Sequence, residues 1–334
     1  MGATSEKTMP MLSCSFPPGP DTVEHVALAE RLGYERAWFY DSPALYFDVW
    51  ATLARVADRC DRIALGTSVI VPRLRHIAVT ASAVAQIASL APGRFTLGVG
   101  AGFTGARTLG EKPMRWDRIV DFSEALRALW RGESVEWEGK VIELMYDSEY
   151  LPVLPLEVPI WFGAEGPKGL AAARRAADGV LSVRLGPEGF DRVGRIITGT
   201  VLDDDEPSDS DRVWAAAGHA AATRYHLAYE MGADMSALPN AEAWRASIEA
   251  LPAAERHLVL HSGHVTSVSA HDAAFVPRDA VASLTFTGTV ELLRERAERL
   301  AAKGVTELIY QPAGPDVPRE LEAFARLREM VAAG

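Results

Sequence analysis

The sequence predicts a single (β/α)8 barrel over residues 1–334, an α/β fold with a long, mainly helical insertion late in the chain. Short apolar segments alternate with longer amphipathic ones, which is the pattern of βαβ units around a parallel sheet. The alternations amount to about eight strand–helix units, the number that a closed barrel needs. A doubly wound open sheet is the alternative, but Ser15-Phe16-Pro17-Pro18 after the first strand is not its glycine-rich turn.

The first part of the chain shows the alternation most clearly. Asp21 and Gly33 suit the two ends of the first helix, since Asp is a common N-cap and Gly a common C-terminal residue. Strands are expected at residues 11–16, 35–40, 63–71 and 94–99, and helices at residues 22–32, 49–57, 79–90 and 117–130.

The alternation resumes after a loop-like stretch at residues 132–155. Further strands are expected at residues 158–162, 179–183 and 305–310, and helices at residues 168–177, 289–303 and 319–330. Residues 202–285 break the rhythm and open with the acidic run Asp203-Asp204-Asp205-Glu206. We interpret residues 212–217 as the seventh strand and most of the remainder as an insertion that covers the binding pocket.

Composition limits the possible classes of function. The chain has 34 basic and 45 acidic residues and a net charge of −11, which argues against a general nucleic-acid binder but allows a local basic pocket. Cys14 and Cys60 cannot form a disulfide framework. Residues 1–10 lack the apolar stretch of a signal peptide, and no apolar run is long enough to span a bilayer. A cytoplasmic protein without membrane or nucleic-acid partners is expected.

Candidate functional residues lie where the strands end, because the carboxyl ends of barrel strands carry the active site. The strand ends read Tyr40-Asp41-Ser42-Pro43, Gly66-Thr67-Ser68-Val69, Gly98-Val99-Gly100-Ala101-Gly102-Phe103-Thr104 and Phe162-Gly163-Ala164-Glu165-Gly166-Pro167-Lys168. The last runs straight into a helix, so its free amides and Lys168 could bind an anion; an ordinary strand-to-helix turn is the alternative. The fourth-strand glycines suit a barrel mouth with an aromatic ring against the backbone better than a Rossmann turn.

Four segments carry a resemblance to a known family. They read RIALGTSVIVPRLRH, ASAVAQIASLAPGRFTLGVGAGFTG, PIWFGAEGPKGLAAARRAADGVL and FTGTVELLRERAERLAAKGVTELIYQPAG. In this order the chain resembles the bacterial luciferase-like oxidoreductases, in the branch of deazaflavin (coenzyme F420)-dependent enzymes similar to methylenetetrahydromethanopterin reductase. The resemblance implies a hydride transfer between F420 and a small organic substrate.

The resemblance also implies roles for particular residues. The cofactor ring is expected on a bulge with a non-prolyl cis peptide at Ser68-Val69, with Asp41 beside the ring as the catalytic candidate. A simple turn cap is the alternative role for Asp41. The cofactor-binding set is Asp41, Ser68, Val69, Gly100, Ala101, Gly102, Thr104, Gly163, Ala164, Glu165, Gly166, Pro167 and Lys168. A homodimer through helices near the second and third strands, helped by the small residues of 78–91, is expected.

Two departures from the family pattern affect the chemistry. Ser42 stands where some members have a catalytic His, and Phe103 stands where a relative has an acid. Sugar-phosphate dehydrogenation is therefore doubtful, although His261 or His264 could donate a proton. With His257 they could also suggest a metal site, but no accompanying ligand pattern supports one, and no metal is expected.

Two other functions stay open. One is an FMN-dependent monooxygenase that uses reduced flavin and oxygen, and the other is a non-catalytic flavin-binding barrel. The segments GTSV and YQPAG favour the deazaflavin, and the retained Asp41 and glycine turn argue against a barrel that has lost catalysis.

Overall fold

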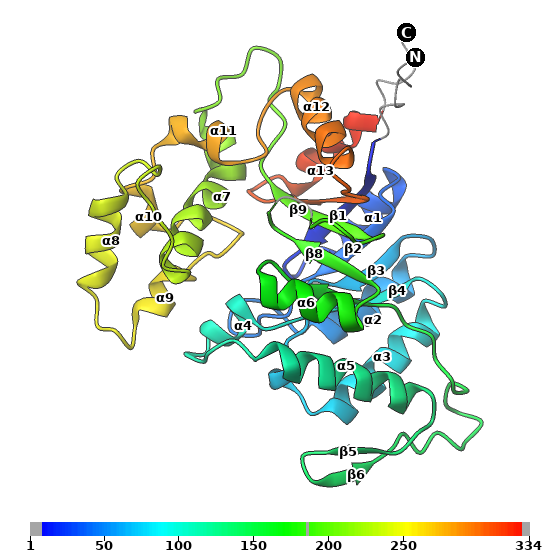
Figure 1. Ribbon diagram of the computed structural model, residues 1–334. Coiled ribbons are helices and arrows are strands. Elements are labelled where there is room, and N and C mark those ends of the chain that lie inside the picture. Colours follow the sequence, from blue (N-terminus) through cyan, green and yellow to red (C-terminus); the bar gives the residue numbers. More distant parts are fainter. Residues whose placement is uncertain (1–8, 185–186, 329–334) are drawn as a thin grey trace, which may run out of the picture.

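Eight parallel strands close into a barrel in the order β1-β10-β9-β8-β7-β4-β3-β2 (Figure 1). The computed structural model describes residues 9–184 and 187–328. The barrel strands are β1 (Met11–Phe16), β2 (Arg36–Phe39), β3 (Ala64–Thr67), β4 (Phe95–Gly100), β7 (Ile160–Gly163), β8 (Gly179–Ser182), β9 (Val193–Thr198) and β10 (Glu307–Gln311). The predicted (β/α)8 barrel is confirmed.

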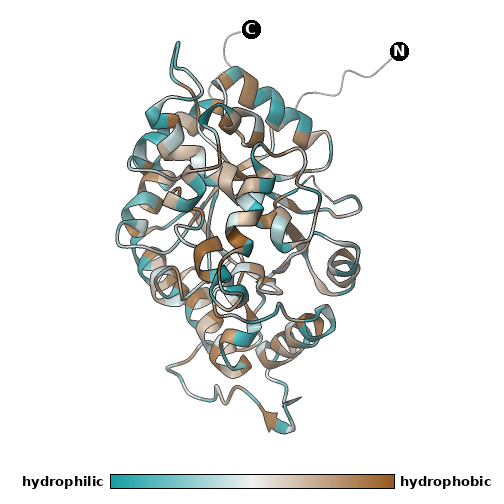
Figure 2. Ribbon diagram, turned by 90° about the vertical axis from the view of Figure 1, so that its left-hand side faces the viewer, coloured by the Kyte–Doolittle hydropathy of each residue, from teal (hydrophilic) through white to brown (hydrophobic). Residues whose placement is uncertain are grey.

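Helices surround the barrel and bury one face each. They are α1 (Thr22–Arg31), α2 (Val49–Arg59), α3 (Ile77–Leu90), α5 (Trp116–Trp130), α6 (Pro167–Ala176), α12 (Val290–Ala301) and α13 (Val317–Ala325). In α2, Asp48 caps the first turn by accepting from Trp50 N and Ala51 N, both at 2.9 Å, and Leu53 and Val56 are fully buried. Figure 2 shows the resulting mixture of hydrophilic and hydrophobic segments along the surface helices.

One predicted strand is wrong. Residues 212–217 belong to the long helix α7 (Asp211–Glu230), and the seventh strand is β9, which pairs with β8 and β10. Ser210 caps α7 by accepting from Val213 N at 3.2 Å, and alanines, the strongest helix formers, follow. The buried Val213 and Ala217 lie four residues apart on one helix face, so the apolar spacing is helical rather than alternating.

Other boundaries differ in smaller ways. The third strand ends at Thr67, four residues before its predicted end, and the stretch at 132–155 contains the hairpin β5 (Val135–Trp137) and β6 (Lys140–Ile142). A short helix, α4 (Phe103–Arg107), follows β4. The end of the helix expected at 319–330 and most of segment 1–10 lie outside the described residues.

The insertion builds its own small core beside the barrel, at the left of Figure 1. It consists of α7, α8 (Ala241–Glu249), α9 (Arg256–Leu260), α10 (Ala270–Ala273) and α11 (Val281–Leu284). Trp244 lies at its centre: its ring stacks on His226 at 5.7 Å, and its Nε1 donates to Asp272 at 3.0 Å. The predicted helical character of this region is confirmed. Among the described residues, no helix is both long enough and apolar enough to cross a membrane.

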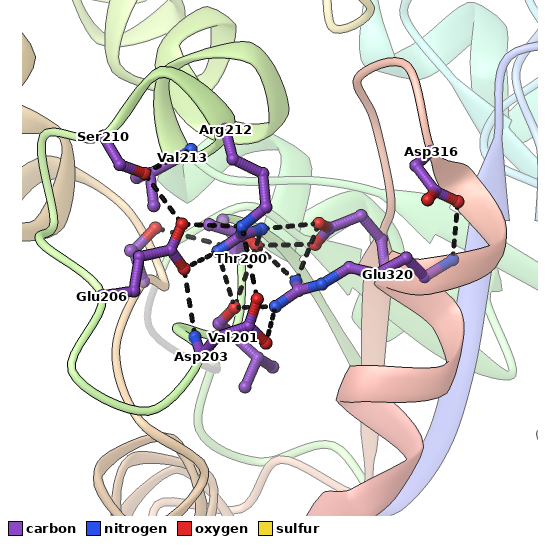
Figure 3. A network of polar contacts seen from close by, with 12 residues as sticks. Thr200, Val201, Asp203, Glu206, Ser210, Arg212, Val213, Asp316 and Glu320 are labelled. Carbon is purple, nitrogen blue, oxygen red and sulfur yellow. Dashed lines mark hydrogen bonds and ion pairs between the residues drawn. The ribbon is translucent and has the colours of Figure 1, made fainter.

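A network of charged side chains ties the start of α7 to the barrel (Figure 3). Arg212 donates to Glu320 at 3.0 Å, to Thr200 Oγ1 at 2.9 Å and to Glu206 Oε1 at 2.8 Å. Arg319 donates to the same Glu320 oxygen, Oε1, at 2.9 Å. Glu320 is almost completely buried, so it depends on these guanidinium groups to offset its desolvation.

The network responds to acid through Glu206. Burial alone would raise the pKa of Glu206, but hydrogen bonds from Arg212, the Asp203 amide and Ser210 lower it to about 2. A carboxylate with a lowered folded-state pKa stabilises the fold above its unfolded pKa of 4.5 and loses that contribution as pH falls toward 2.

We expect Arg212→Ala to lower the free energy of unfolding by about 2–3 kcal/mol, because it removes a main partner of a buried carboxylate. Arg278→Ala is the matched control. Arg278 pairs with Asp211 at the start of the same helix, but the two side chains are 48% and 94% exposed, so its loss should be below about 1 kcal/mol. Urea unfolding measures both, and equal losses would contradict the anchoring role.

Candidate active site

A cavity of about 370 Å³ opens at the carboxyl ends of the barrel strands, between the barrel and the insertion. Barrel residues that follow β2, β3 and β4 line one side, and α7 residues line the other. Five predicted site residues line it: Asp41, Ser68, Val69, Gly102 and Thr104. The two positions that depart from the family pattern, Ser42 and Phe103, also face the cavity.

The third strand breaks at the cavity. The peptide bond between Ser68 and Val69 is cis, as the family resemblance predicts. Around it, Thr67 Oγ1 donates to Gly98 O at 2.8 Å and accepts from Gly98 N at 2.9 Å, and Ile70 N donates to the same carbonyl at 2.8 Å. The Thr67 side chain thus satisfies backbone groups that a regular β3–β4 ladder would satisfy.

Glycines in the neighbouring strands make room for this break. A Cβ on Gly100 would lie 2.4 Å from Val69 Cγ2, and one on Gly163 would lie 2.9 Å from Val69 Cγ1. A Cβ on Gly98 would lie 1.8 Å from Thr67 O. Gly100 and Gly163, which were expected at the cofactor, therefore underlie Val69, and neither belongs to the cavity lining.

Asp41 is buried and forms an ion pair that the sequence analysis did not foresee. Arg75 donates to both of its oxygens, at 2.6 and 3.0 Å, and to Asp48 at 2.9 Å. Burial raises the pKa of Asp41, and the Arg75 guanidinium opposes that rise. Both oxygens of Asp41 accept from Arg75, so the Asp41 carboxylate adds a fixed, buried charge pair to the cavity wall. Next to Arg75, His76 caps α3 through Nδ1.

The turn at Gly163–Lys168 lies outside the cavity lining. Its Glu165 carboxylate accepts from Ser182 Oγ at 3.1 and 3.2 Å and from Val183 N, so it braces β8. Gly166 is the N-cap of α6 without a side-chain cap, and a Cβ there would meet nothing within 4 Å. The turn thus presents a free helix N-terminus beside open space, and Lys168 is exposed next to it. Ala101 is likewise not in the lining.

Histidines of the insertion line the side of the cavity that faces the barrel strands. His264 lines the cavity with its Nε2 3.3 Å from Thr104 Oγ1, and the His261 ring lies 5.2 Å away. Burial lowers the pKa of His264 well below its usual value, and the neighbouring His261 adds to this. A neutral imidazole at the wall can accept a proton. His257 does not line the cavity, and no His, Cys, Asp and Glu cluster suited to a metal occurs among the described residues.

Comparisons with known proteins identify a family and several relatives of this chain. The family profile described as luciferase-like monooxygenase matches residues 4–307. The chain is 31% identical over 195 residues to 5,10-methylenetetrahydromethanopterin reductase of Methanolobus tindarius, covering 57% of this chain and 58% of that protein. It is 33% identical over 177 residues to F420-dependent hydroxymycolic acid dehydrogenase of Mycobacterium tuberculosis, covering 48% of each. The matches thus span about half of these relatives' lengths.

Two solved structures share the fold over nearly the whole chain. The coenzyme F420-dependent tetrahydromethanopterin reductase from Methanopyrus kandleri superposes with a TM-score of 0.67 at 19% identity, covering 96% of this chain and 98% of that one. An F420-dependent secondary alcohol dehydrogenase in complex with an F420–acetone adduct gives a TM-score of 0.67 at 19% identity, covering 96% and 99%. At this identity the likeness shows the fold.

Proposed function

Because the chain belongs to the luciferase-like monooxygenase family, we propose that it is an oxidoreductase that transfers a hydride between coenzyme F420 and a small organic substrate. The observation that carries the proposal is the cavity at the carboxyl ends of the barrel strands, lined by Asp41, Ser68 and Val69, in a chain whose curated relatives include F420-dependent dehydrogenases. An FMN-dependent monooxygenase is the second candidate, because the family is described as luciferase-like monooxygenases.

The residues at the bulge fit a flat heterocycle. Ser68 Oγ is buried and has no hydrogen-bond partner among the described residues, so it can bond a polar edge of a ring. Val69, Gly102 and Thr104 also line this side of the cavity. The Gly163–Lys168 turn can hold the anionic tail at its free amides. When bound, the deazaflavin supplies the carbon that accepts or donates the hydride.

Side chains at the cavity wall would accept the substrate's proton and provide a fixed negative charge. We assign proton acceptance to the neutral His264 imidazole, since a substrate hydroxyl that loses hydride from its carbon must also lose its proton. Thr104 orients His264 through its hydroxyl. Asp41, held by Arg75, keeps a negative charge near the bulge and is the catalytic residue that we propose there.

We further propose that the enzyme works in the cytoplasm. The support is that Cys14 and Cys60 are both buried and unpaired, as thiols in a reducing compartment are.

The proposed homodimer gives a mass prediction. The outer face of α3 exposes Val79 (55%) and Leu90 (40%), with Ser82, Gln86 and Ser89 exposed between them. The two small serines would let a second helix approach closely. We expect a mass of about twice 36.1 kDa by light scattering at micromolar concentration. Val79→Glu should shift the mass toward the monomer; a monomeric wild type would refute the dimer.

The cofactor assignment is tested by titrating the purified protein with F420 and with FMN under the same conditions. We expect F420 to bind at least about tenfold more tightly, with turnover that needs no oxygen. Tighter binding of FMN, with oxygen-dependent turnover of reduced FMN and none with F420, would replace the proposal by the monooxygenase.

The same titration with Gly166→Val locates the tail. The backbone of Gly166 has φ −95° and ψ 169°, which valine adopts readily, and the added atoms would enter open space, so the fold should be unchanged. We expect weaker F420 binding by about tenfold, with the melting temperature lowered by no more than about a few degrees because valine is a poorer N-cap than glycine. Unchanged affinity would place the tail elsewhere.

For Asp41→Asn we expect turnover to fall at least about tenfold while F420 affinity changes little, because the amide keeps the shape and loses the charge. Asp48→Asn is the control, since Asp48 also bonds Arg75 but its side chain is 52% exposed. Equal activity of Asp41→Asn and wild type would leave Asp41 a purely structural partner of Arg75.

A further inference from the structure

Two arginines in the cavity wall have no anionic partner among the residues that the structure describes. Arg195 on β9 and Arg224 on α7 both line the cavity. The Nε and Nη1 atoms of Arg195 are buried and have no hydrogen-bond partner in the described part of the chain. Arg224 is exposed at the rim of the cavity and donates through Nε to the carbonyl of Leu284 at 3.0 Å. A buried guanidinium with unused donors is costly unless something bonds it.

Two other arginines that are shielded from solvent pair with carboxylates. Arg36 bonds Glu307 at 2.6 Å, and Arg75 bonds Asp41 at 2.6 Å. Within residues 9–184 and 187–328, no carboxylate lies within 4.0 Å of a guanidinium nitrogen of Arg195 or Arg224. Glu165 attracts Arg195 electrostatically, but its oxygens already accept from Ser182 and Val183. Arg195 thus keeps two buried guanidinium nitrogens without a hydrogen-bond partner in the described part of the chain.

Repulsion between neighbouring guanidinium groups adds to the cost of the unpaired positive charge. Burial and, to a smaller extent, the neighbouring Arg224 lower the pKa of Arg195 to about 10. Burial also lowers the pKa of Arg224, and Arg184 adds to that effect. Arg195 and Arg224 thus repel each other at the cavity wall, in a protein whose net charge is −11. An oxyanion placed between Arg195 and Arg224 would relieve the repulsion and use the free donors.

Building on the proposed function, we propose that the substrate carries a carboxylate or phosphate group and that Arg195 and Arg224 bind it. The planar, multi-donor guanidinium fork matches both oxyanions. Ile197 and Phe286 line the cavity beside these arginines and offer apolar contact to the rest of the molecule. Since Arg195 belongs to the barrel and Arg224 to the insertion, the bound anion would join the two parts.

The anionic tail of the cofactor is the other source of such a group. The tail site proposed above is the Gly163–Lys168 turn, which does not line the cavity, whereas Arg224 comes from the insertion. These positions favour the substrate as the source, and the experiment separates the two.

The first test titrates inorganic phosphate into the full-length protein without cofactor, against chloride at the same ionic strength. We expect saturable binding to the wild type, weakened at least about tenfold in Arg195→Gln and in Arg224→Gln, by loss of a charge-assisted hydrogen bond. Arg192→Gln is the control, because it removes the same charge from an exposed position next to β9. Phosphate binding that is absent in the wild type, or equal in all variants, would overturn the proposal.

Melting temperatures separate a binding role from a structural one. Arg195→Gln removes a buried charge that nothing in the described structure pairs, so the ligand-free variant should melt no lower than the wild type. A marked decrease would indicate a structural role and count against the anion site. Should that variant fail to fold, Arg224→Gln decides the phosphate titration.

Repeating the titration with saturating F420, and with the deazaflavin chromophore that lacks the anionic tail, identifies the source. Phosphate affinity that is the same with either bound supports a substrate site. Loss of phosphate binding with F420 alone would assign the arginines to the tail and overturn the proposal. Because phosphate binding needs no deazaflavin, a protein that proved to use FMN would still show the site, so the two proposals fail separately.

Discussion

The close approach of Val69 to the strands β4 and β7 is the constraint on which the barrel mouth depends. Val69 lies where the Cβ atoms of Gly100 and Gly163 would be, and Thr67 lies where that of Gly98 would be. The backbone break at the third strand therefore needs glycine on two further strands at once. With those three positions lacking side chains, Ser68 and Val69 reach the cavity, and the Thr67 hydroxyl repairs the interrupted ladder.

This constraint explains what the sequence could and could not reveal about the site. Ser68, Val69, Asp41, Gly102 and Thr104 could be placed at the cavity because strand ends in a barrel converge on one face. Gly100 and Gly163 carry the same glycine signal, yet they serve Val69, since a sequence does not tell whether a missing side chain makes room for a ligand or for a neighbour. The sequence did not predict the roles of the arginines, because an arginine's partner can lie far away in the chain. Arg195 and Arg224 lie on different elements, and Arg75 is distant in sequence from its partner Asp41.

The fold was predictable wherever hydrophobic period and length agreed. Residues 212–217 failed because a short run such as Val213-Trp214-Ala215 is compatible with strand or helix, and only the Ser210 cap and the alanines beyond decide for helix. The true seventh strand, β9, includes Arg195, a charged residue that weakens the apolar signal of a buried strand. A functional side chain thus obscured the element that carries it, which is expected where local rules are broken for binding.

Buried charges are paired where they hold α7 to the barrel, whereas the arginines that face the cavity have no carboxylate partner among the described residues. Where Arg212 and Arg319 surround Glu320, every partner is in place before any ligand arrives, so α7 is held firmly at its first turn. Three turns further along the same helix, Arg224 faces the cavity without a carboxylate partner in the described structure. The anchor at Arg212 fixes the position of α7 relative to the barrel. The unpaired Arg224 on the same helix is therefore held at a defined position for a ligand. The unpaired arginines make the ligand-free protein less stable than it could be. An anion that binds them would raise the free energy of unfolding.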